Sequence, residues 1–275
     1  MAQLLTNTYG KGRVRVLRVV RGAEGRHDVY EAEVKAMLEG DFAATYLTGD
    51  NGKVTPTDTV KNTVQILAQK HLGPCPQAFA LALGDYFLSA YPAVAKARVE
   101  VTLRRWERYA GRPHTFQGGS SGLPYGRVEI DRENCRVEGG VRGLLVLNST
   151  NSAFKGYPKD AYTTLPETDD RILATQVDAT WLYAARGADF AADAAILETL
   201  LTTFADTFSP SLQNTLYLMG QAALEKVPAI EEIHLAMPNK HYLPVNFAPF
   251  KLENPGEIFL PTDEPHGQIE ARLGR

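Results

Sequence analysis

The order of extended and helical segments constrains the fold of this chain more than any other feature of its sequence. Apolar and polar residues alternate over 29–38 and 97–106, and more weakly over 127–134. Such alternation is typical of antiparallel strands with one side facing solvent or another subunit. A further strand is predicted to begin near residue 9, in YGKGRVRVLRV. The first half therefore contains two pairs of strands.

Two helices are predicted between these pairs of strands. The first follows the sequence TPTD, and the second opens with Pro76, a residue that suits the first position of a helix. Apolar residues recur at helical spacing in each helix: Val60, Val64, Leu67 and Ala68 in the first, and Phe79, Leu83, Phe87 and Ala90 in the second. The first half therefore has the order strand, strand, helix, helix, strand, strand.

The second half repeats this order. The segments predicted as strands are 139–150, 171–183, 229–237 and 242–247, and those predicted as helices are 193–205 and 210–227. The pattern predicts an α+β chain made of two tandem ββααββ units, residues 1–138 and 139–275. The last 25 residues are rich in Pro, Asp and Glu, and we expect them to form an ordered tail or surface loop.

Charge and cysteine content exclude several classes of protein. The chain has 275 residues with 29 Lys and Arg against 32 Asp and Glu, a net charge of −3, which argues against nucleic acid as the main partner. No apolar run approaches the roughly 20 residues that span a bilayer, and the first residues lack a signal-peptide pattern. Cys75 and Cys135 are predicted to be free thiols, which fits a reducing compartment such as the cytoplasm.

Two predicted helix starts have residues that could bind an anion. In TPTDTVKNTV, Thr55 is predicted as the N-cap, Pro56 as the first helical residue and Asp58 as the partner in a capping box. The same first turn, with Thr57, has free N–H groups and the positive end of the helix dipole. From these residues alone, a plain helix start is favoured over a ligand site.

Other polar residues carry equally weak signals when taken alone. SPSLQNTLY predicts a second helix start, with Ser209 as its cap and Gln213 one turn in. Asn239 and His241 end a strand in MPNKHYL, where a turn or solvated edge is the usual explanation, and a lone histidine is no metal site. Lys11 begins a strand beside two glycines, a position in which lysine is normally solvated.

Taken together and in order, these segments resemble the urate oxidase (uricase) family of the tunnelling-fold group. The matching segments are YGKGRVRV, PTDTVKNTV, LNSTNSAF, YTTLPETDDRILATQVDATW, SLQNTLY and PNKHY, which extend over nearly the whole chain. The resemblance implies two tandem tunnelling-fold (T-fold) domains, each an antiparallel sheet with helices on one face. It also implies assembly of the chain into a tunnel-shaped barrel.

The resemblance implies a role for each matching residue. Lys11 corresponds to the catalytic lysine, Thr57 to the threonine that links it to a bound water, and Asp58 to a neighbour whose backbone contacts the ligand. The residues that correspond to the rest of the site are Phe154, which stacks on the purine, Arg171 and Gln213, which bind opposite edges of the ring, Leu212, which makes a backbone contact, and Asn239 and His241, which line the oxygen and water side.

These roles suit the chemistry of urate. Urate is flat and weakly acidic, so a guanidinium and a primary amide on opposite edges can each make two hydrogen bonds with it, and Phe154 can stack on it. Without the resemblance, a salt bridge at Arg171 and a core or interface contact at Phe154 would be the simpler explanations. Lys11 can act as a base only if its pKa falls well below the free value of about 10.4.

No cofactor is expected. The Gly-rich stretch 118–122 lacks a strand-to-helix context, and no metal-ligand cluster is visible in the sequence. The expected reaction converts urate, dioxygen and water to 5-hydroxyisourate and hydrogen peroxide. The alternatives are another tunnelling-fold enzyme acting on a purine or pterin, and a non-catalytic purine-binding protein with the same fold.

The resemblance also implies a homotetramer with active sites at subunit interfaces. Lys11, Thr57, Asp58 and His241 would come from one chain, and Phe154, Arg171 and Gln213 from another. Lys155 replaces a bulky aromatic that is common in the family, at the rim of the site. The chain ends in ARLGR instead of a peroxisomal tripeptide, which favours the cytoplasm.

Overall fold

The computed structural model describes residues 2–275, apart from the side chain of residue 263. The helices are α1 (Ala43–Leu47), α2 (Thr57–His71), α3 (Pro76–Ala90), α4 (Ala192–Asp206) and α5 (Leu212–Lys226). The strands are β1 (Tyr9–Arg21), β2 (His27–Gly40), β3 (Val94–Arg108), β4 (Phe116–Gly119), β5 (Leu123–Asp131), β6 (Cys135–Asn148), β7 (Leu173–Tyr183), β8 (Ile230–Ala236), β9 (Asn239–Pro244), β10 (Phe259–Gly267) and β11 (Glu270–Gly274). Among these residues, no helix is long and apolar enough to cross a membrane.

The described chain forms two compact units, and each is considered by itself. Unit 1 extends to Arg142 and includes Thr180–Asp193, whereas unit 2 comprises Gly143–Ala179 and Ala194–Arg275. The predicted domain boundary at residues 138 and 139 falls within β6. The two units are defined by compactness, whereas the predicted boundary rests on the repeated order of strands and helices. The boundary between the duplicated halves therefore stays a prediction.

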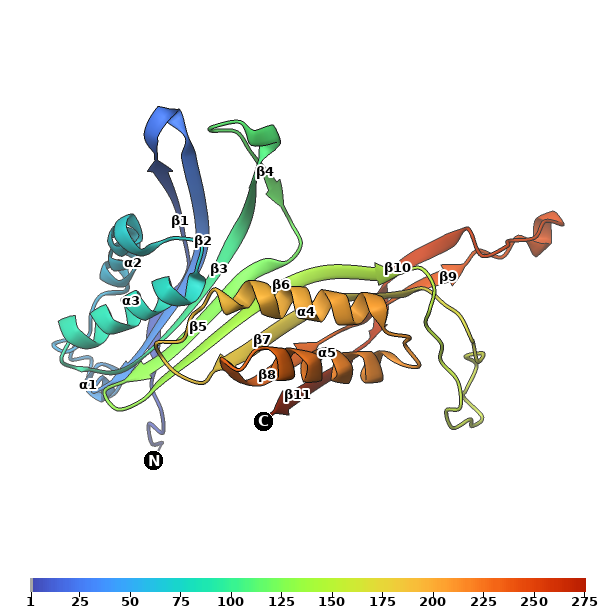
Figure 1. Ribbon diagram of the computed structural model, residues 1–275. Helices are drawn as coiled ribbons and strands as arrows, with labels where there is room; N and C mark the ends of the chain where they lie inside the picture. The colour runs from blue at the N-terminus through green and yellow to red at the C-terminus, as the bar shows by residue number, and fades with distance from the viewer. Residues whose placement is uncertain (1) are drawn as a thin grey trace. The chain divides into compact units, whose positions relative to one another are not determined.

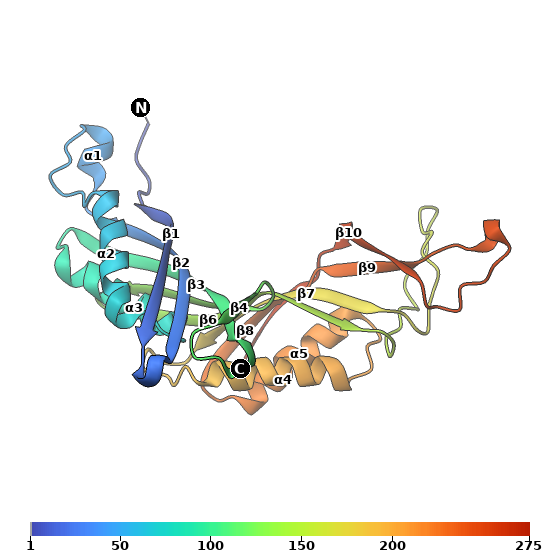
Figure 2. The same ribbon diagram turned by 90° about the horizontal axis from the view of Figure 1, so that it is seen from above.

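Unit 1 is an antiparallel sheet with the strand order β1-β2-β3-β5-β6. Helices α2 and α3 lie along one face of this sheet (Figure 1; Figure 2). The alternation in the sequence explains this packing, because every second residue of β3 points toward the helices. The fully buried core residues include Val60, Val64, Phe79, Leu83 and Phe87 from the helices and Ala97, Val99 and Val101 from β3.

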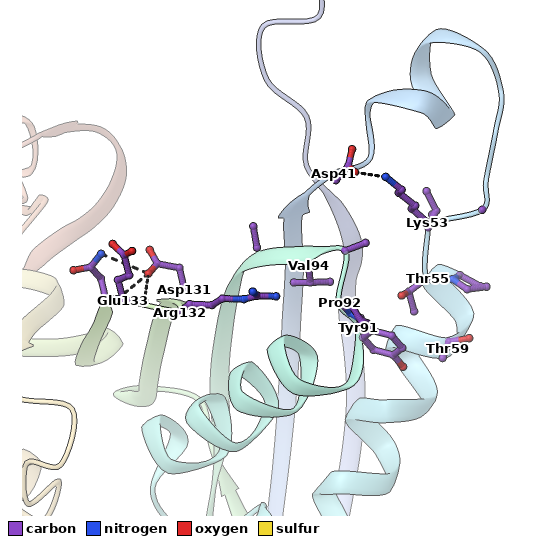
Figure 3. A pocket seen from close by; sticks show the side chains of 16 residues that line it. Asp41, Lys53, Thr55, Thr59, Tyr91, Pro92, Val94, Asp131, Arg132 and Glu133 are labelled. Carbon is purple, nitrogen blue, oxygen red and sulfur yellow. Dashed lines mark hydrogen bonds and ion pairs between the residues drawn. The ribbon is translucent and has the colours of Figure 1, made fainter.

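A hollow of about 1030 Å³ lies in unit 1 beside the start of α2. Its walls come from residues 52–56, 91–95 and 131–134 (Figure 3). Asp41 and Lys53 form an ion pair at this hollow. Lys11, Thr57 and Asp58 do not line it. The hollow therefore does not coincide with the predicted catalytic residues.

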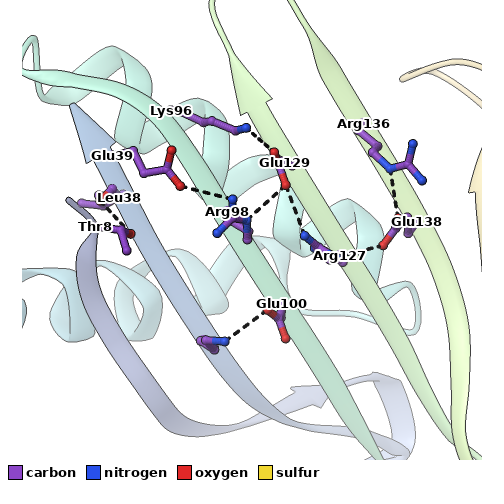
Figure 4. A network of polar contacts seen from close by, with 11 residues as sticks. Thr8, Leu38, Glu39, Lys96, Arg98, Glu100, Arg127, Glu129, Arg136 and Glu138 are labelled. Atoms are coloured by element: carbon purple, nitrogen blue, oxygen red, sulfur yellow. Dashed lines mark hydrogen bonds and ion pairs between the residues drawn. The ribbon is translucent and has the colours of Figure 1, made fainter. Parts of the chain in front are cut away.

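The opposite face of the unit 1 sheet carries a ladder of charged residues (Figure 4). Arg98 Nε donates to Glu129 Oε2 at 3.1 Å, and Lys96 pairs with the same carboxylate. Arg127 bridges Glu129 at 3.2 Å and Glu138 at 3.6 Å. Burial opposes the ionisation of Glu129, but the hydrogen bonds from Lys96 and Arg98 outweigh it and lower the pKa of this carboxyl to about 2.

Unit 1 also contains a half-buried carboxylate with several donors. Gln77 Nε2 and Trp181 Nε1 each donate to Asp193 at 2.7 Å, and the Tyr183 hydroxyl donates as well. Burial raises the pKa of Asp193, although these donors oppose the shift. A Cβ at Gly139 would lie 2.4 Å from Trp181 Nε1, so only glycine leaves room for the cluster. The cluster joins α3, the end of β7 and the start of α4.

Unit 2 has a smaller sheet and helices α4 and α5. Strand β8 pairs with β11, and β9 pairs with both β7 and β10. Helix α5 packs on β8 and β11 (Figure 1). The buried residues that hold these elements together include Leu200, Leu212, Leu216, Ile233 and Leu235.

Most predicted elements are present, with small shifts at their ends. The strand predicted over 127–134 ends at Asp131, and the one predicted over 242–247 is β9, which starts earlier, at Asn239. Helix α1 and strand β4 were not predicted, and both are short. The prediction for the last 25 residues was wrong where it allowed a loop, because they contain all of β10 and all of β11.

Both predicted helix caps were also wrong. Helix α2 begins at Thr57, with Pro56 in the N-cap position, so Thr55 and Asp58 form no capping box. Thr55 instead donates its backbone N–H to the Tyr9 hydroxyl at 2.9 Å. Helix α5 is capped by Ser211, whose hydroxyl accepts from the Asn214 N–H at 3.2 Å. Local sequence predicted the two helix starts but missed the residues that cap them.

Candidate active site

In unit 1, Lys11 lies next to a β-bulge at the start of β1. Lys11 pairs with Ala36 and Val14 pairs with Val34, so β1 has one more residue than β2 across this interval. Arg13, within the bulge, has a φ of 55°, which is rare for a residue with a side chain. Bulges reorient neighbouring side chains and are enriched beside active sites. Lys11 is half-buried there.

Tyr9 connects the beginning of β1 to the segment that precedes α2. Its hydroxyl accepts the Thr55 N–H, and its ring meets Phe42 edge-on with the centroids 4.8 Å apart. Burial raises the pKa of Tyr9, so the phenol stays protonated over the physiological range. Tyr9 therefore holds the start of β1 close to the start of α2.

Thr57 and Asp58 are the first two residues of α2. The first hydrogen bond within the helix runs from the Val60 N–H to the Pro56 carbonyl at 3.1 Å. Among the residues that the structure describes, no side chain caps this end. The N–H groups of the first turn therefore stay available to a ligand, together with the positive end of the helix dipole.

The Asp58 side chain makes contacts within α2 and does not cap the first turn. It is exposed, pairs with Lys61 and accepts a hydrogen bond from Asn62 Nδ2 at 3.1 Å. These contacts, led by the one with Lys61, lower the pKa of Asp58, and the charge of Lys11 adds to the effect. Lys11 therefore lies close enough to the start of α2 for its charge to act on Asp58.

In unit 2, Arg171 and Phe154 lie together. Arg171 Cζ is 5.2 Å from the centroid of the Phe154 ring, and Arg171 Nε donates to the buried Ser152 Oγ at 3.3 Å. Burial lowers the pKa of Arg171, but a guanidinium keeps its charge at physiological pH. Within residues 2–275, no carboxylate pairs with this guanidinium, which leaves most of its donors available to an anion.

Ser209 connects the segment that contains Phe154 to the start of α5. Its carbonyl accepts the Ala153 N–H at 2.8 Å, and its hydroxyl accepts from Thr215 Oγ1 at 2.7 Å. Leu212 and Gln213 are the first two residues of α5. Leu212 is buried and Gln213 is exposed. Of these two side chains, only the Gln213 amide can therefore reach a ligand.

Asn239 and His241 lie on β9 and point to the same side, because residues two apart in a strand share a face. Asn239 is paired with Thr175 of β7. The Thr175 hydroxyl is fully buried and lacks a hydrogen-bond partner in the described part of the chain. Both Asn239 and His241 are half-buried.

The predicted residues therefore form two sets. Lys11, Thr57 and Asp58 lie near one another in unit 1. Phe154, Arg171, Leu212, Gln213, Asn239 and His241 belong to unit 2. In the part of the chain that is described, no three His, Cys, Asp or Glu side chains gather into a metal-binding group.

Sequence reasoning missed several supporting residues. Ser152 and Ser209 hold the unit 2 set, Tyr9 holds the unit 1 set, and Tyr157 stacks on Phe154. Only Tyr157 has a local signal, since it follows Phe154 by three residues and comes directly after a glycine.

Comparison with known proteins adds independent information. A family model described as Uricase matches residues 7–129 and 137–270. The chain is 41% identical over 270 residues to the uricase of Arthrobacter globiformis, covering 98% of this chain and 89% of that protein. It is 37% identical over 286 residues to the uricase of Dictyostelium discoideum, covering 100% of this chain and 98% of that protein.

Solved structures show the same similarity. The crystal structure of uricase from Arthrobacter globiformis matches with a TM-score of 0.95 at 40% identity, covering 100% of this chain and 96% of that chain. A urate oxidase mutant from Bacillus sp. TB-90 matches with a TM-score of 0.86 at 23% identity, covering 98% of this chain and 99% of that chain. At that lower identity the match speaks for the fold alone.

Proposed function

The chain belongs to the uricase family, and from this premise we propose that it oxidises urate with dioxygen at a site completed by two copies of the chain. The family and the α+β fold class predicted from the sequence are confirmed. The roles of single residues and the assembly are our proposals.

The observation that carries the proposal is the environment of Arg171. Its half-buried guanidinium lies beside Phe154 and pairs with no carboxylate of the described chain. A planar anion satisfies both groups, since it can accept a forked pair of hydrogen bonds from Arg171 and stack on Phe154. Gln213 then supplies a donor and an acceptor to another edge of the ring. Urate has this shape and charge.

Lys11, Thr57 and His241 would handle protons. Urate passes two electrons to dioxygen, a water molecule supplies the hydroxyl that bonds to the ring, and the products are 5-hydroxyisourate and hydrogen peroxide. The Lys11 amine would receive a proton that urate or water gives up, with the Thr57 hydroxyl relaying it through ordered water. The free N–H groups at the start of α2 would stabilise negative charge nearby.

We propose that the two sets of residues meet between chains of a homotetramer. Lys11 lies on β1, which ends the strand order of unit 1, and exposed sheet edges are normally paired or covered. Leu17 on the same strand is 53% exposed, which favours such a cover. The resemblance grouped His241 with Lys11, Thr57 and Asp58. Because His241 belongs to unit 2 of the chain and Lys11 to unit 1, we propose instead that His241 acts with the unit 2 set.

The activity is tested by following the ultraviolet absorbance of urate with purified protein under air. We expect the absorbance to fall while dioxygen is consumed and peroxide appears. Folded protein that leaves the absorbance unchanged would refute the proposed function.

The shared site is tested by mixing two inactive variants, Lys11→Ala and Arg171→Ala. In randomly mixed oligomers about a quarter of the sites would combine an intact unit 1 set with an intact unit 2 set. Activity should therefore return on co-expression, to about a quarter of the wild-type value per site. Mixed oligomers that stay inactive would show that each chain builds its own site.

The cytoplasm stays our proposed location. Both Cys75 and Cys135 are free thiols, which suits a reducing compartment. Cell fractionation with an antibody against the protein would test this.

A further inference from the structure

Phe154 is itself stacked on by another aromatic ring of unit 2. The Tyr157 ring lies with its centroid 4.9 Å from that of Phe154, and the two planes differ by 19°. This is an offset stack, the arrangement that aromatic pairs favour. Beyond Tyr157, Lys159 Nζ is 5.8 Å from the Tyr157 ring centroid and pairs with Glu167 at 3.3 Å.

Backbone and side-chain hydrogen bonds hold Tyr157 in this position. Phe154 and Thr168 exchange two backbone hydrogen bonds of 2.9 and 3.1 Å, and the Tyr157 hydroxyl donates to the Leu165 carbonyl at 2.6 Å. Between the two aromatics, Gly156 has a φ of 77° and donates its N–H to Glu167 Oε1 at 3.1 Å. The left-handed glycine turns the chain back, so that the ring of Tyr157 can reach the ring of Phe154.

We propose that Tyr157 is a positioning residue that fixes the Phe154 ring as the platform on which the substrate stacks. A ring has two faces. The anchored Tyr157 ring covers one of them, so a planar ligand would stack on the other, next to Arg171, whose Cζ lies over the Phe154 ring 5.2 Å from its centroid. An ordered platform also lowers the entropy cost of binding, because the Phe154 ring need not be immobilised by the ligand. This inference rests on the proposed function, in which Phe154 stacks on urate.

The test compares wild-type protein with Tyr157→Ala, Tyr157→Phe and Tyr162→Ala. Tyr162 is the matched control, because it lies in the same loop and its side chain is 91% exposed. Three constants are measured: the KM and kcat for urate, and the Kd for xanthine, an oxypurine that lacks the C8 oxygen. Thermal unfolding and sedimentation verify that each variant is folded and assembled.

We expect Tyr157→Ala to raise the KM for urate and the Kd for xanthine about three- to tenfold, the range reported for aromatic pairs, with a smaller effect on kcat. Tyr157→Phe keeps the stacking ring but loses the hydroxyl bond to Leu165, so its effect should lie between wild type and Tyr157→Ala. Tyr162→Ala should stay within about twofold of wild type. A double-mutant cycle with Phe154→Ala adds the decisive control. If Tyr157 acts through Phe154, replacing Tyr157 should have no further effect on xanthine binding once Phe154 is alanine.

Several outcomes would overturn the inference. An unchanged Kd in Tyr157→Ala, or an equal loss in the Phe154→Ala background, would reduce Tyr157 to a general loop contact. Tighter binding in Tyr157→Ala would mean that Tyr157 competes with the ligand for its face of the ring. If wild type binds xanthine but does not oxidise urate, the proposed function fails while the role of Tyr157 is still decided by the Kd values. Wild type that neither binds nor oxidises would overturn both.

Discussion

Helices α2 and α5 both begin with a pair of predicted ligand-binding residues, but the two starts differ in what they present. At α2, Thr57 and Asp58 follow an N-cap proline, and no described side chain occupies the free N–H groups of the first turn. At α5, Ser211 caps the helix, Leu212 is buried, and the Gln213 amide is the exposed polar group.

This difference suggests a division of labour between the two units. The start of α2, with Lys11 nearby, offers backbone dipoles, a hydroxyl and an amine, which are groups suited to charge and proton transfer. The start of α5, with Arg171 and Phe154, offers shape and hydrogen-bond recognition of a planar anion. Substitutions of Lys11 and Thr57 should therefore reduce kcat most, and those of Arg171 and Gln213 should reduce affinity most.

The largest effect is expected for Lys11→Ala. We expect kcat for urate to fall by about 10²- to 10⁴-fold, the usual range for loss of a proton-transfer group, while the Kd for xanthine changes little. Thr57→Ala should show the same pattern, with a lower kcat for urate and little change in the Kd for xanthine. Lys70→Ala, at the other end of α2, is the control and should be neutral. Equal losses in kcat and affinity would contradict a proton-transfer role.

The next largest effect is expected for Arg171→Lys. Lysine keeps the charge but loses the planar fork, so kcat/KM and the affinity for xanthine should fall about 10- to 100-fold. Arg186→Lys, which alters a surface ion pair with Asp85, serves as the control. A loss confined to kcat, with KM and Kd unchanged, would assign Arg171 to the catalytic step instead.

A smaller, pH-dependent effect is expected for Glu129→Gln in the charged ladder of unit 1. The folded-state pKa of Glu129, about 2, lies below its ordinary value of 4.5, so the ionised carboxylate stabilises the fold above about pH 4.5. That stability is lost as the pH falls through about 2. At pH 7 we expect the variant to lose about 2 kcal/mol in urea unfolding.

The difference between wild type and Glu129→Gln should shrink steadily from pH 4.5 downward. Glu133→Gln, an exposed residue in the turn before β6, is the matched control. A difference that is constant with pH would mean that the carboxylate charge is not the source of the stability.

The smallest effect is expected at the cap of α5. Ser211→Ala removes the acceptor for the Asn214 N–H and should cost about 1 kcal/mol in the free energy of unfolding. Ser211→Asn keeps a capping oxygen and should recover most of the loss. If Ser211→Ala leaves the unfolding midpoint unchanged, α5 would resemble α2 in depending on no side-chain cap.

The sequence predicted most helices and strands because their signals are local. The stripe of Val60 and Val64 and the alternation around Val99 each repeat within a few residues, and burial enforces them. The caps were misplaced because both helices begin later than predicted, α2 at Thr57 and α5 at Leu212, and the expected cap residues make other contacts. Thr55 is bonded to Tyr9, and Ser209 is bonded to Ala153 and Thr215.

The candidate site shows the same limit. Its residues were found through motifs, but the sequence alone does not show that Ser152 holds Arg171 or that Tyr157 covers Phe154. The strands of the C-terminal region were also missed. Strand β11 pairs with β8, whose residues lie far away in the sequence, and no local pattern reports such a partner.

By itself, the sequence determined the family, the alternation of strands and helices, and the residues suited to bind a planar anion. These follow from side-chain chemistry and short-range periodicity, which a chain carries in every conformation. Only the tertiary structure decided which hydrogen bonds each polar group makes, which residues cap the helices, and how Tyr157 lies against Phe154. Such contacts join residues far apart along the chain or depend on one left-handed turn, so they arise only when the chain is folded.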